Sequence, residues 1–291
     1  MSGTRLSFYL RLSSTVLLWI VMLGTIFAGF PIGCLLLIAA LSLSALYEFF
    51  HMLGAQKIPC FKLTGMIFAT VFLVADFVYL SRPGLAGFDI DLALLVAFII
   101  LVFARQMFAP VRDREPLEAM AYTLFGILYI VWLFSFLLKI LFLTPATPSG
   151  ATTGQFYALF AVAIAKFSDM GAYAFGSLFG KHPFAPHISP KKTWEGFFGA
   201  LISSIIAAYW MRALMADQLS LIGFWDATFL GLVLGFVAVV GDLAESVLKR
   251  SVLAKDSSHI LPGIGGTLDL IDSVLFTAPV MYFYLRWFVI P

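Results

Sequence analysis

The chain has 291 residues, of which 62% are hydrophobic and only 12% are charged. A typical soluble protein is about 45–50% apolar and about 25% charged, so this surplus of apolar residues has no place in a water-facing fold. The composition excludes a soluble enzyme, a nucleic-acid-binding protein, a disulfide-rich secreted scaffold and a disordered chain. The net charge of +2 is too small to indicate a class of partner. Cys34 and Cys60 stand at opposite ends of one apolar segment, too far apart for a disulfide.

Nine apolar segments of roughly membrane-spanning length follow one another along the chain. A transmembrane helix needs about 20 predominantly apolar residues. The predicted spans are residues 12–30, 32–50, 63–80, 92–107, 121–143, 156–179, 197–211, 219–240 and 268–290. The sequence therefore predicts an all-α, polytopic membrane protein with about nine spans, divided into an N-terminal scaffold (1–150) and a C-terminal region (151–291) that holds the chemistry.

The lysines and arginines predict the orientation of the chain in the membrane. With a cytoplasmic N-terminus, thirteen of the eighteen basic residues fall on the cytoplasmic face. Only Arg82 and Arg212 fall on the opposite face, while Lys139, Lys166 and Arg286 lie inside spans. Positive residues are enriched in cytoplasmic loops, so the N-terminus is expected in the cytoplasm and the protein in the cell (inner) membrane.

Two ionisable groups lie inside the sixth predicted span. A charge at the centre of a bilayer costs at least about 2.5–3.5 kcal/mol, so such groups are functional candidates. Lys166 and Asp169 are three residues apart, which places them on one face of a helix where they can pair. A structural ion pair explains this spacing as well as a functional site does.

Acidic residues also follow the eighth span and open the ninth. Asp242 and Glu245 share one helical stripe with Lys249, and Asp269 and Asp272 lie three residues apart at the start of an otherwise apolar helix. Two buried carboxylates repel each other, so one must be protonated or a cation must lie between them. Capping of the helix explains Asp269 but not the deeper Asp272. Mg²⁺ prefers oxygen ligands and often takes one or two carboxylates with substrate phosphates, so we predict a metal site.

Glycines and basic residues lie beside these acids in the sequence. Gly263, Gly265 and Gly266 precede the ninth span, where backbone N–H groups can converge on an anion. The basic residues just upstream are Lys249, Arg250 and Lys255. A second basic loop precedes the seventh span and contains Ser189, Lys191, Lys192 and Thr193. Phosphate binding and attachment to anionic lipid headgroups explain this second loop equally well.

The order of these motifs is similar to that of a known family. The C-terminal residues read Ser246-x-x-Lys249-Arg250, then Lys255-Asp256, then Pro262-Gly263-x-Gly265-Gly266-x-x-Asp269-x-x-Asp272. Upstream stand Ser168-Asp169 with Gly176 and Gly180, and then Ser189-Pro190-Lys191-Lys192-Thr193. Over roughly residues 160–276 this pattern resembles the phosphatidate cytidylyltransferases, also called CDP-diacylglycerol synthases. Ile264 and Leu270 replace the family's usual His and Arg, and Thr267 stands at a usually apolar position, whereas every carboxylate and lysine of the pattern is kept.

The resemblance implies an integral-membrane nucleotidyltransferase that condenses CTP with phosphatidate, giving CDP-diacylglycerol and pyrophosphate in phospholipid biosynthesis. Its partners are CTP, phosphatidate and the lipid bilayer, with a homodimer as an option. Its cofactor is Mg²⁺, with room for a second monovalent or divalent cation. The implied cavity lies among the C-terminal helices and opens to the cytoplasm.

The resemblance also implies roles for individual residues. The expected metal ligands are Asp269, Asp242 and Asp272, with Asp169 as a further contributor. The expected contacts to the CTP phosphates are Ser189, Lys191, Lys192 and Thr193. The lipid phosphate or the departing pyrophosphate is assigned to Lys249, Arg250 and the catalytic Lys255, with backbone donors from Gly263, Gly265 and Gly266.

Three other functions stay open at this point. A cytidylyltransferase for another lipid phosphate would use the same site. A secondary transporter would also place Lys166, Asp169 and Asp242 within the membrane, although the sequence contains no internal repeat. An inactive scaffold is suggested only by Ile264 and Leu270.

Overall fold

The computed structural model of the chain is almost entirely helical, and it describes residues 16–82, 89–108, 113–143, 154–252 and 265–290. Within these residues, eight helices are long and apolar enough to cross a membrane, and Val16–Phe27 forms a shorter apolar helix. Each overlaps one of the nine predicted spans. The predicted all-α, polytopic membrane fold is therefore confirmed.

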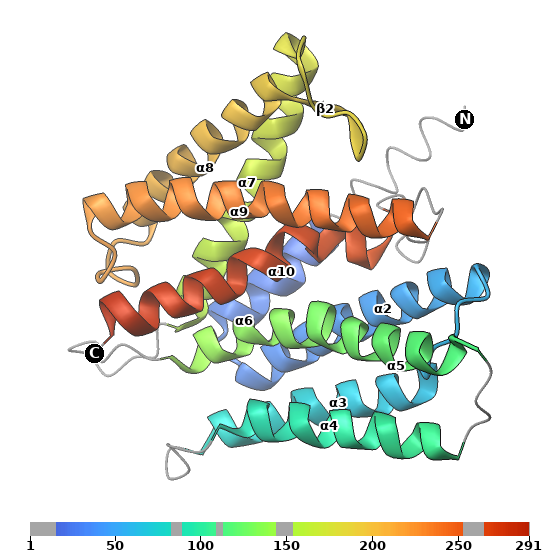
Figure 1. Ribbon diagram of the computed structural model, residues 1–291. Coiled ribbons are helices and arrows are strands. Elements are labelled where there is room, and N and C mark those ends of the chain that lie inside the picture. The colour runs from blue at the N-terminus through green and yellow to red at the C-terminus, as the bar shows by residue number, and fades with distance from the viewer. Residues whose placement is uncertain (1–15, 83–88, 109–112, 144–153, 253–264, 291) are drawn as a thin grey trace, which may run out of the picture. The chain divides into compact units, whose positions relative to one another are not determined.

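The helices have the following bounds (Figure 1). They are α2 (Pro31–Ala55), α3 (Lys62–Leu80), α4 (Ile90–Met107), α5 (Glu115–Gly126), the π-helical η2 (Ile127–Trp132), α6 (Leu133–Phe142), α7 (Gly154–Phe179), α8 (Trp194–Leu214), α9 (Phe224–Ser251), α10 (Thr267–Tyr284) and the π-helical η3 (Leu285–Val289). The segments α5, η2 and α6 follow one another without a break and together form one span, Glu115–Phe142.

The structure differs from the sequence-based prediction at two places that bear on the site. The helix α9 continues to Ser251, about three turns beyond the predicted end of the eighth span at residue 240. Asp242 and Glu245 therefore lie within a regular helix. The expected loop before α8 contains a short antiparallel hairpin, made of β1 (Pro183–Ala185) and β2 (Ser189–Thr193).

The described chain forms two compact units. The first consists of Met1–Leu138 and Val252–Leu270, and the second of Lys139–Ser251 and Ile271–Pro291, apart from the residues outside the described ranges. In the first unit α2 packs against α3, and α3 packs against α4. Its core contains Phe50, Phe72 and Phe98, all of them buried. The assignment of a scaffold to residues 1–150 and of catalysis to 151–291 stays a prediction.

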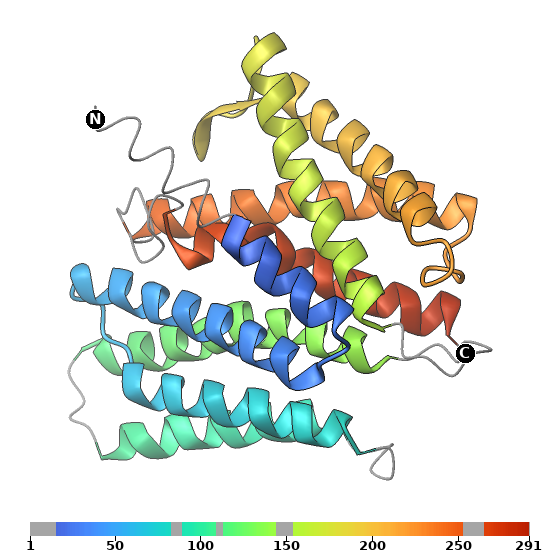
Figure 2. The same cartoon turned by 180° about the vertical axis from the view of Figure 1, so that it is seen from behind.

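The second unit is organised by close packing of small residues. The helices α7 and α8 share the most extensive contact between any two described elements, and they lie side by side in both views (Figures 1 and 2). A side chain at Gly171 would collide with Ser203, and one at Gly199 would collide with Phe175. Small residues let transmembrane helices approach closely and gain van der Waals contact. The glycines of this region therefore hold α7 against α8.

Candidate functional site

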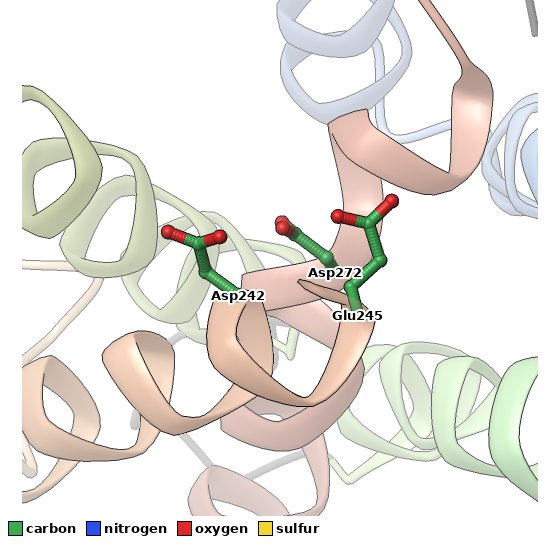
Figure 3. Close-up of side chains that lie close together, drawn as sticks. All are labelled: Asp242, Glu245 and Asp272. Atoms are coloured by element: carbon green, nitrogen blue, oxygen red, sulfur yellow. The ribbon is translucent and has the colours of Figure 1, made fainter. Parts of the chain in front are cut away.

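Three carboxylates converge in the second unit. Asp242 and Glu245 project from α9, and Asp272 projects from α10 toward the space between them (Figure 3). One carboxylate oxygen from each residue lies within 4.8 Å of those of the other two. Glu245 and Asp272 are buried, and Asp242 is half-buried. The geometry therefore gathers two of the predicted metal ligands, Asp242 and Asp272, and adds Glu245.

A glycine lets the two helices bring these acids together. A Cβ atom on Gly241 would lie 2.6 Å from the carbonyl oxygen of Asp272 and 3.1 Å from the Cα atom of Ser273. No real Cβ fits at 2.6 Å from a backbone atom, so only glycine allows this approach of α9 to α10. The residue next to Gly241 is Asp242, and the backbone that it meets is that of Asp272. The packing contact and the acidic cluster are therefore formed by the same few residues.

Two lysines neutralise the α9 members of the cluster. Lys192 Nζ lies 2.9 Å from Asp242 Oδ2, and Lys249 Nζ lies 2.9 Å from Glu245 Oε2. Glu245 is only 2% exposed. A buried charge is tolerated when it is paired and hydrogen-bonded, which explains why a lysine one helical turn away accompanies this glutamate. Lys192 and Lys249 were both predicted to bind phosphate, and the structure places both beside the acids.

A third lysine connects α7 with α10. Lys166 Nζ donates to Asp169 Oδ2 at 3.0 Å and to Ser273 Oγ at 3.1 Å, while Ser273 Oγ donates to the same Asp169 oxygen at 3.0 Å. Lys166 also interacts electrostatically with Asp272 and Asp242. Asp169, predicted as a further metal ligand, thus lies in an adjoining hydrogen-bonded triangle, outside the three-carboxylate cluster. Ser273 follows Asp272 directly, so this triangle borders the cluster.

The charges of this region do not cancel. Four carboxylates belong to it, namely Asp169, Asp242, Glu245 and Asp272, and three ammonium groups, namely Lys166, Lys192 and Lys249. The acids outnumber the lysines, and closely spaced carboxylates repel one another unless one is protonated or a cation lies between them, which favours the entry of a cation. Three carboxylate oxygens within a few ångströms of one another are the hard ligands that Mg²⁺ selects. The residues present therefore fit a divalent cation.

The hairpin positions the second basic motif. Lys192 and Thr193 end β2, and Thr193 caps α8 by accepting a hydrogen bond at 3.2 Å from the backbone N–H of Gly196. Ser189 is half-buried and Lys191 is exposed. Arg250 Nε donates to the carbonyl oxygen of Ile188 at 3.4 Å, so the hairpin also contacts the end of α9. Among the predicted CTP contacts, the structure therefore brings Lys192 to the acids, whereas Thr193 also has a structural role.

The remaining predicted residues belong to the first unit or fall outside the described residues. Asp269 belongs to the first compact unit, where its Oδ2 accepts a hydrogen bond at 3.1 Å from the backbone N–H of Gly266. Gly265 has a φ of +114°, a backbone conformation that favours glycine. Lys255 and Gly263 fall outside the described residues.

Sequence reasoning did not assign a metal role to Glu245. It had placed Glu245 on the same helical stripe as Asp242, which is the signal that could have led to the assignment. The predicted span ends at residue 240, which puts Asp242 inside or at the membrane boundary and gives Glu245 no role of its own. Ser273 gave no signal, because a serine in an apolar helix is common.

Taken together, the fold and the site define a polytopic membrane protein in which acids and lysines are clustered between C-terminal helices. The sequence profile of the Cytidylyltransferase family matches residues 9–288, and the chain belongs to this family. It is similar to the phosphatidate cytidylyltransferase of Staphylococcus saprophyticus, with 32% identity over 252 residues, 86% of this chain and 89% of the relative. The same-named proteins of Staphylococcus epidermidis and Staphylococcus aureus are 30% identical, over the same shares of each chain. The resemblance stated from the motifs is confirmed.

Proposed function

We propose that this chain is a phosphatidate cytidylyltransferase, which converts CTP and phosphatidate to CDP-diacylglycerol and pyrophosphate. The observation that carries the proposal is the cluster of Asp242, Glu245 and Asp272 with Lys192 and Lys249, in a chain of the Cytidylyltransferase family. Closely spaced carboxylates beside lysines suit a site that binds a cation together with phosphates.

The proposed reaction needs charge neutralisation more than proton transfer. A phosphate oxygen of phosphatidate attacks the α-phosphorus of CTP, one P–O bond forms, and the bond to the β-phosphate oxygen breaks. The nucleophile is already an anion at neutral pH, so no strong general base is required. The barrier comes from repulsion between two anions, and positioned cations lower it.

The lysines are proposed to hold the two substrates. Lys192, with Lys191, Ser189 and Thr193, is assigned to the CTP phosphates. Lys249 and Arg250, with Lys255 and the glycines at 263, 265 and 266, are assigned to the lipid phosphate or the departing pyrophosphate. The position of Lys192 and Lys249 supports an assignment to phosphate beside the metal, because each ammonium group is paired with one acid of the cluster.

The acids are proposed to hold Mg²⁺. Asp242, Glu245 and Asp272 would be its ligands, with Asp269 and Asp169 as further candidates and a second cation as an option. When bound, the ion would supply positive charge that stabilises the triphosphate and the pyrophosphate leaving group. The protein's own contribution is to exclude water from Glu245 and Asp272 and to hold their oxygens close together.

We further propose that the site faces the cytoplasm, through a cavity among the C-terminal helices that also opens laterally to the bilayer. The distribution of basic residues supports this orientation. CTP would arrive from the cytoplasm, and the diacyl chains would stay in lipid. The N-terminal spans are proposed as a scaffold, with homodimer contacts as an option.

The proposal is tested on the full chain purified in detergent. The protein is given labelled CTP, phosphatidate and Mg²⁺, and the release of pyrophosphate and the formation of CDP-diacylglycerol are measured. Mg²⁺-dependent formation of both products is expected. If a product formed only with another lipid phosphate, the proposed substrate would be wrong. Counterflow in proteoliposomes without a lipid product would indicate a transporter. No reaction at all would indicate an inactive scaffold.

A further inference from the structure

A buried glutamate of the N-terminal spans contacts the beginning of the helix that carries the predicted metal ligands. Glu48 lies on α2 and has no exposed surface. Its Oε1 accepts a hydrogen bond at 2.8 Å from the backbone N–H of Thr267, and its Oε2 accepts one at 2.9 Å from that of Leu268. These partners are 219 and 220 residues away in sequence, and all three residues belong to the first compact unit.

The backbone explains why a carboxylate lies there. The first four N–H groups of a helix have no partner within the helix, and Thr267 and Leu268 are the first two residues of α10. The N-terminal end of a helix also carries partial positive charge, so a carboxylate stabilises it. A carboxylate buried among apolar side chains is costly unless it is hydrogen-bonded. The two hydrogen bonds therefore satisfy both the buried carboxylate of Glu48 and the first backbone N–H groups of α10.

Two backbone N–H groups that donate to two oxygens of one carboxylate constrain a helix more than a single hydrogen bond does. They hold the first turn of α10 against α2 and fix the rotation of that turn about the helix axis. Ser44, one helical turn before Glu48, adds a third contact, because its hydroxyl lies 2.9 Å from that of Thr267. The rotation of this first turn decides the direction in which the next turns of α10 project Asp269 and Asp272.

We infer that Glu48 is a positioning residue for the acids of α10. It acts through the helix: it holds the first turn, and the continuous helix carries that orientation to Asp269 and Asp272. The inference rests on the proposed function, since it concerns the acids assigned there to the metal. It gives a residue of α2 an indirect part in the proposed chemistry, through the first turn of α10.

The test compares three single variants with the wild-type protein. Glu48→Gln keeps the shape but turns an NH₂ group toward one of the two backbone N–H groups. Ser44→Ala removes only the hydroxyl contact to Thr267. Asp76→Asn changes another fully buried carboxylate of the N-terminal spans, on α3, and serves as the matched control for the loss of a buried acid.

For Glu48→Gln we expect kcat to fall roughly 10–100-fold, as it does when groups that orient metal ligands are lost. The Mg²⁺ concentration for half-maximal activity should rise several-fold at the same time. Asp76→Asn should keep the wild-type Mg²⁺ dependence, even where the melting temperature falls, and Ser44→Ala should shift it less than Glu48→Gln does. Glu48→Asp, which keeps the charge but is one methylene shorter, should recover part of the loss.

The inference is overturned if Glu48→Gln has wild-type kcat and wild-type Mg²⁺ dependence, or if Asp76→Asn shifts the Mg²⁺ dependence equally. Two readouts do not need activity. The amides of Thr267 and Leu268 should exchange hydrogen faster in Glu48→Gln, and the rise in melting temperature caused by Mg²⁺ should shrink. A wild-type protein without activity defeats the proposed function alone, and unchanged exchange and Mg²⁺ response in Glu48→Gln defeat the positioning role alone.

Discussion

Lys192 Nζ lies 2.9 Å from Asp242 Oδ2, so the hairpin before α8 and the middle of α9 meet in one ion pair. The lysine was predicted as a phosphate ligand and the aspartate as a metal ligand. Their contact places the two predicted sites next to each other, because a phosphate bound by Lys192 would lie beside the acids.

Replacing Lys192 should weaken the binding of CTP more than replacing the neighbouring Lys191. Lys192→Met removes the ammonium group beside Asp242, whereas Lys191 is exposed. Hydrogen bonds to charged groups contribute about 1.5–3 kcal/mol, so KM for CTP should rise roughly tenfold or more in Lys192→Met. Lys191→Met is the matched control and should give the smaller rise. Equal effects in initial-rate measurements would contradict the role assigned to Lys192.

Asp272→Asn should remove the response to Mg²⁺ while leaving the protein folded. The change relieves repulsion among buried acids, so the melting temperature without Mg²⁺ should not fall. The stabilisation by Mg²⁺ should disappear, and pyrophosphate release should drop by more than roughly 100-fold, as when a preorganised electrostatic group is lost. Melting curves with and without Mg²⁺ separate these effects. A wild-type Mg²⁺ response in Asp272→Asn would exclude this residue as a ligand.

Glu245 can be tested apart from its role in stability. Glu245→Gln breaks the ion pair with the largely buried Lys249, and breaking a buried ion pair costs about 3–5 kcal/mol. The double variant Glu245→Gln/Lys249→Met removes both charges and should recover most of the melting temperature. Activity should stay low in the single and the double variant. Near wild-type activity in the double variant would show that neither side chain takes part in the reaction.

Gly241→Ala should separate α9 from α10. Its Cβ would lie 2.6 Å from the Asp272 carbonyl, and overpacking of this kind costs about 1–3 kcal/mol. We expect a lower melting temperature and a loss of Mg²⁺-dependent activity. Gly54→Ala is the control, since a Cβ there meets nothing within 4 Å and replacing a helical glycine stabilises by about 0.5–1 kcal/mol. Equal melting temperatures for the two variants would argue against close packing at Gly241.

Cysteine labelling can test the proposed orientation. In a variant with Cys34 and Cys60 replaced, Gln56→Cys places an exposed thiol in the connection before α3, and Ser81→Cys places one at the C-terminal end of α3. A membrane-impermeant maleimide should label Gln56→Cys only from the cytoplasmic side and Ser81→Cys only from the other side. The reverse pattern would invert the proposed topology.

The spans were predictable because hydrophobic length alone defines them. Each of the nine apolar segments overlaps a helix, but the ends were less certain. The eighth span was predicted to end at residue 240, just before Asp242 and Glu245. In the structure α9 continues through both acids to Ser251, and each acid is paired with a lysine. The compensating lysine for Asp242 comes from a distant segment, and no local pattern reveals such a partner.

The sequence predicted that acids would converge at this site, but it did not predict all of the residues that surround them. Asp242 and Asp272 are close together, as expected, because both the motif and the cost of burying acids pointed to them. The hairpin was missed because strands of three and five residues give almost no periodic signal. The contact of Glu48 with Thr267 depends on tertiary packing, which the sequence does not encode in any short segment.

The ion pair between Lys192 and Asp242 has a thermodynamic consequence for the order of events. A phosphate that draws Lys192 away leaves the carboxylates with more unbalanced negative charge, and a cation on Asp242 frees Lys192 for the phosphate. Under the proposed function such coupling is reciprocal, so nucleotide should increase the affinity for metal by the same factor as metal increases that for nucleotide. The ion pair would then make the binding of either ligand depend on the presence of the other.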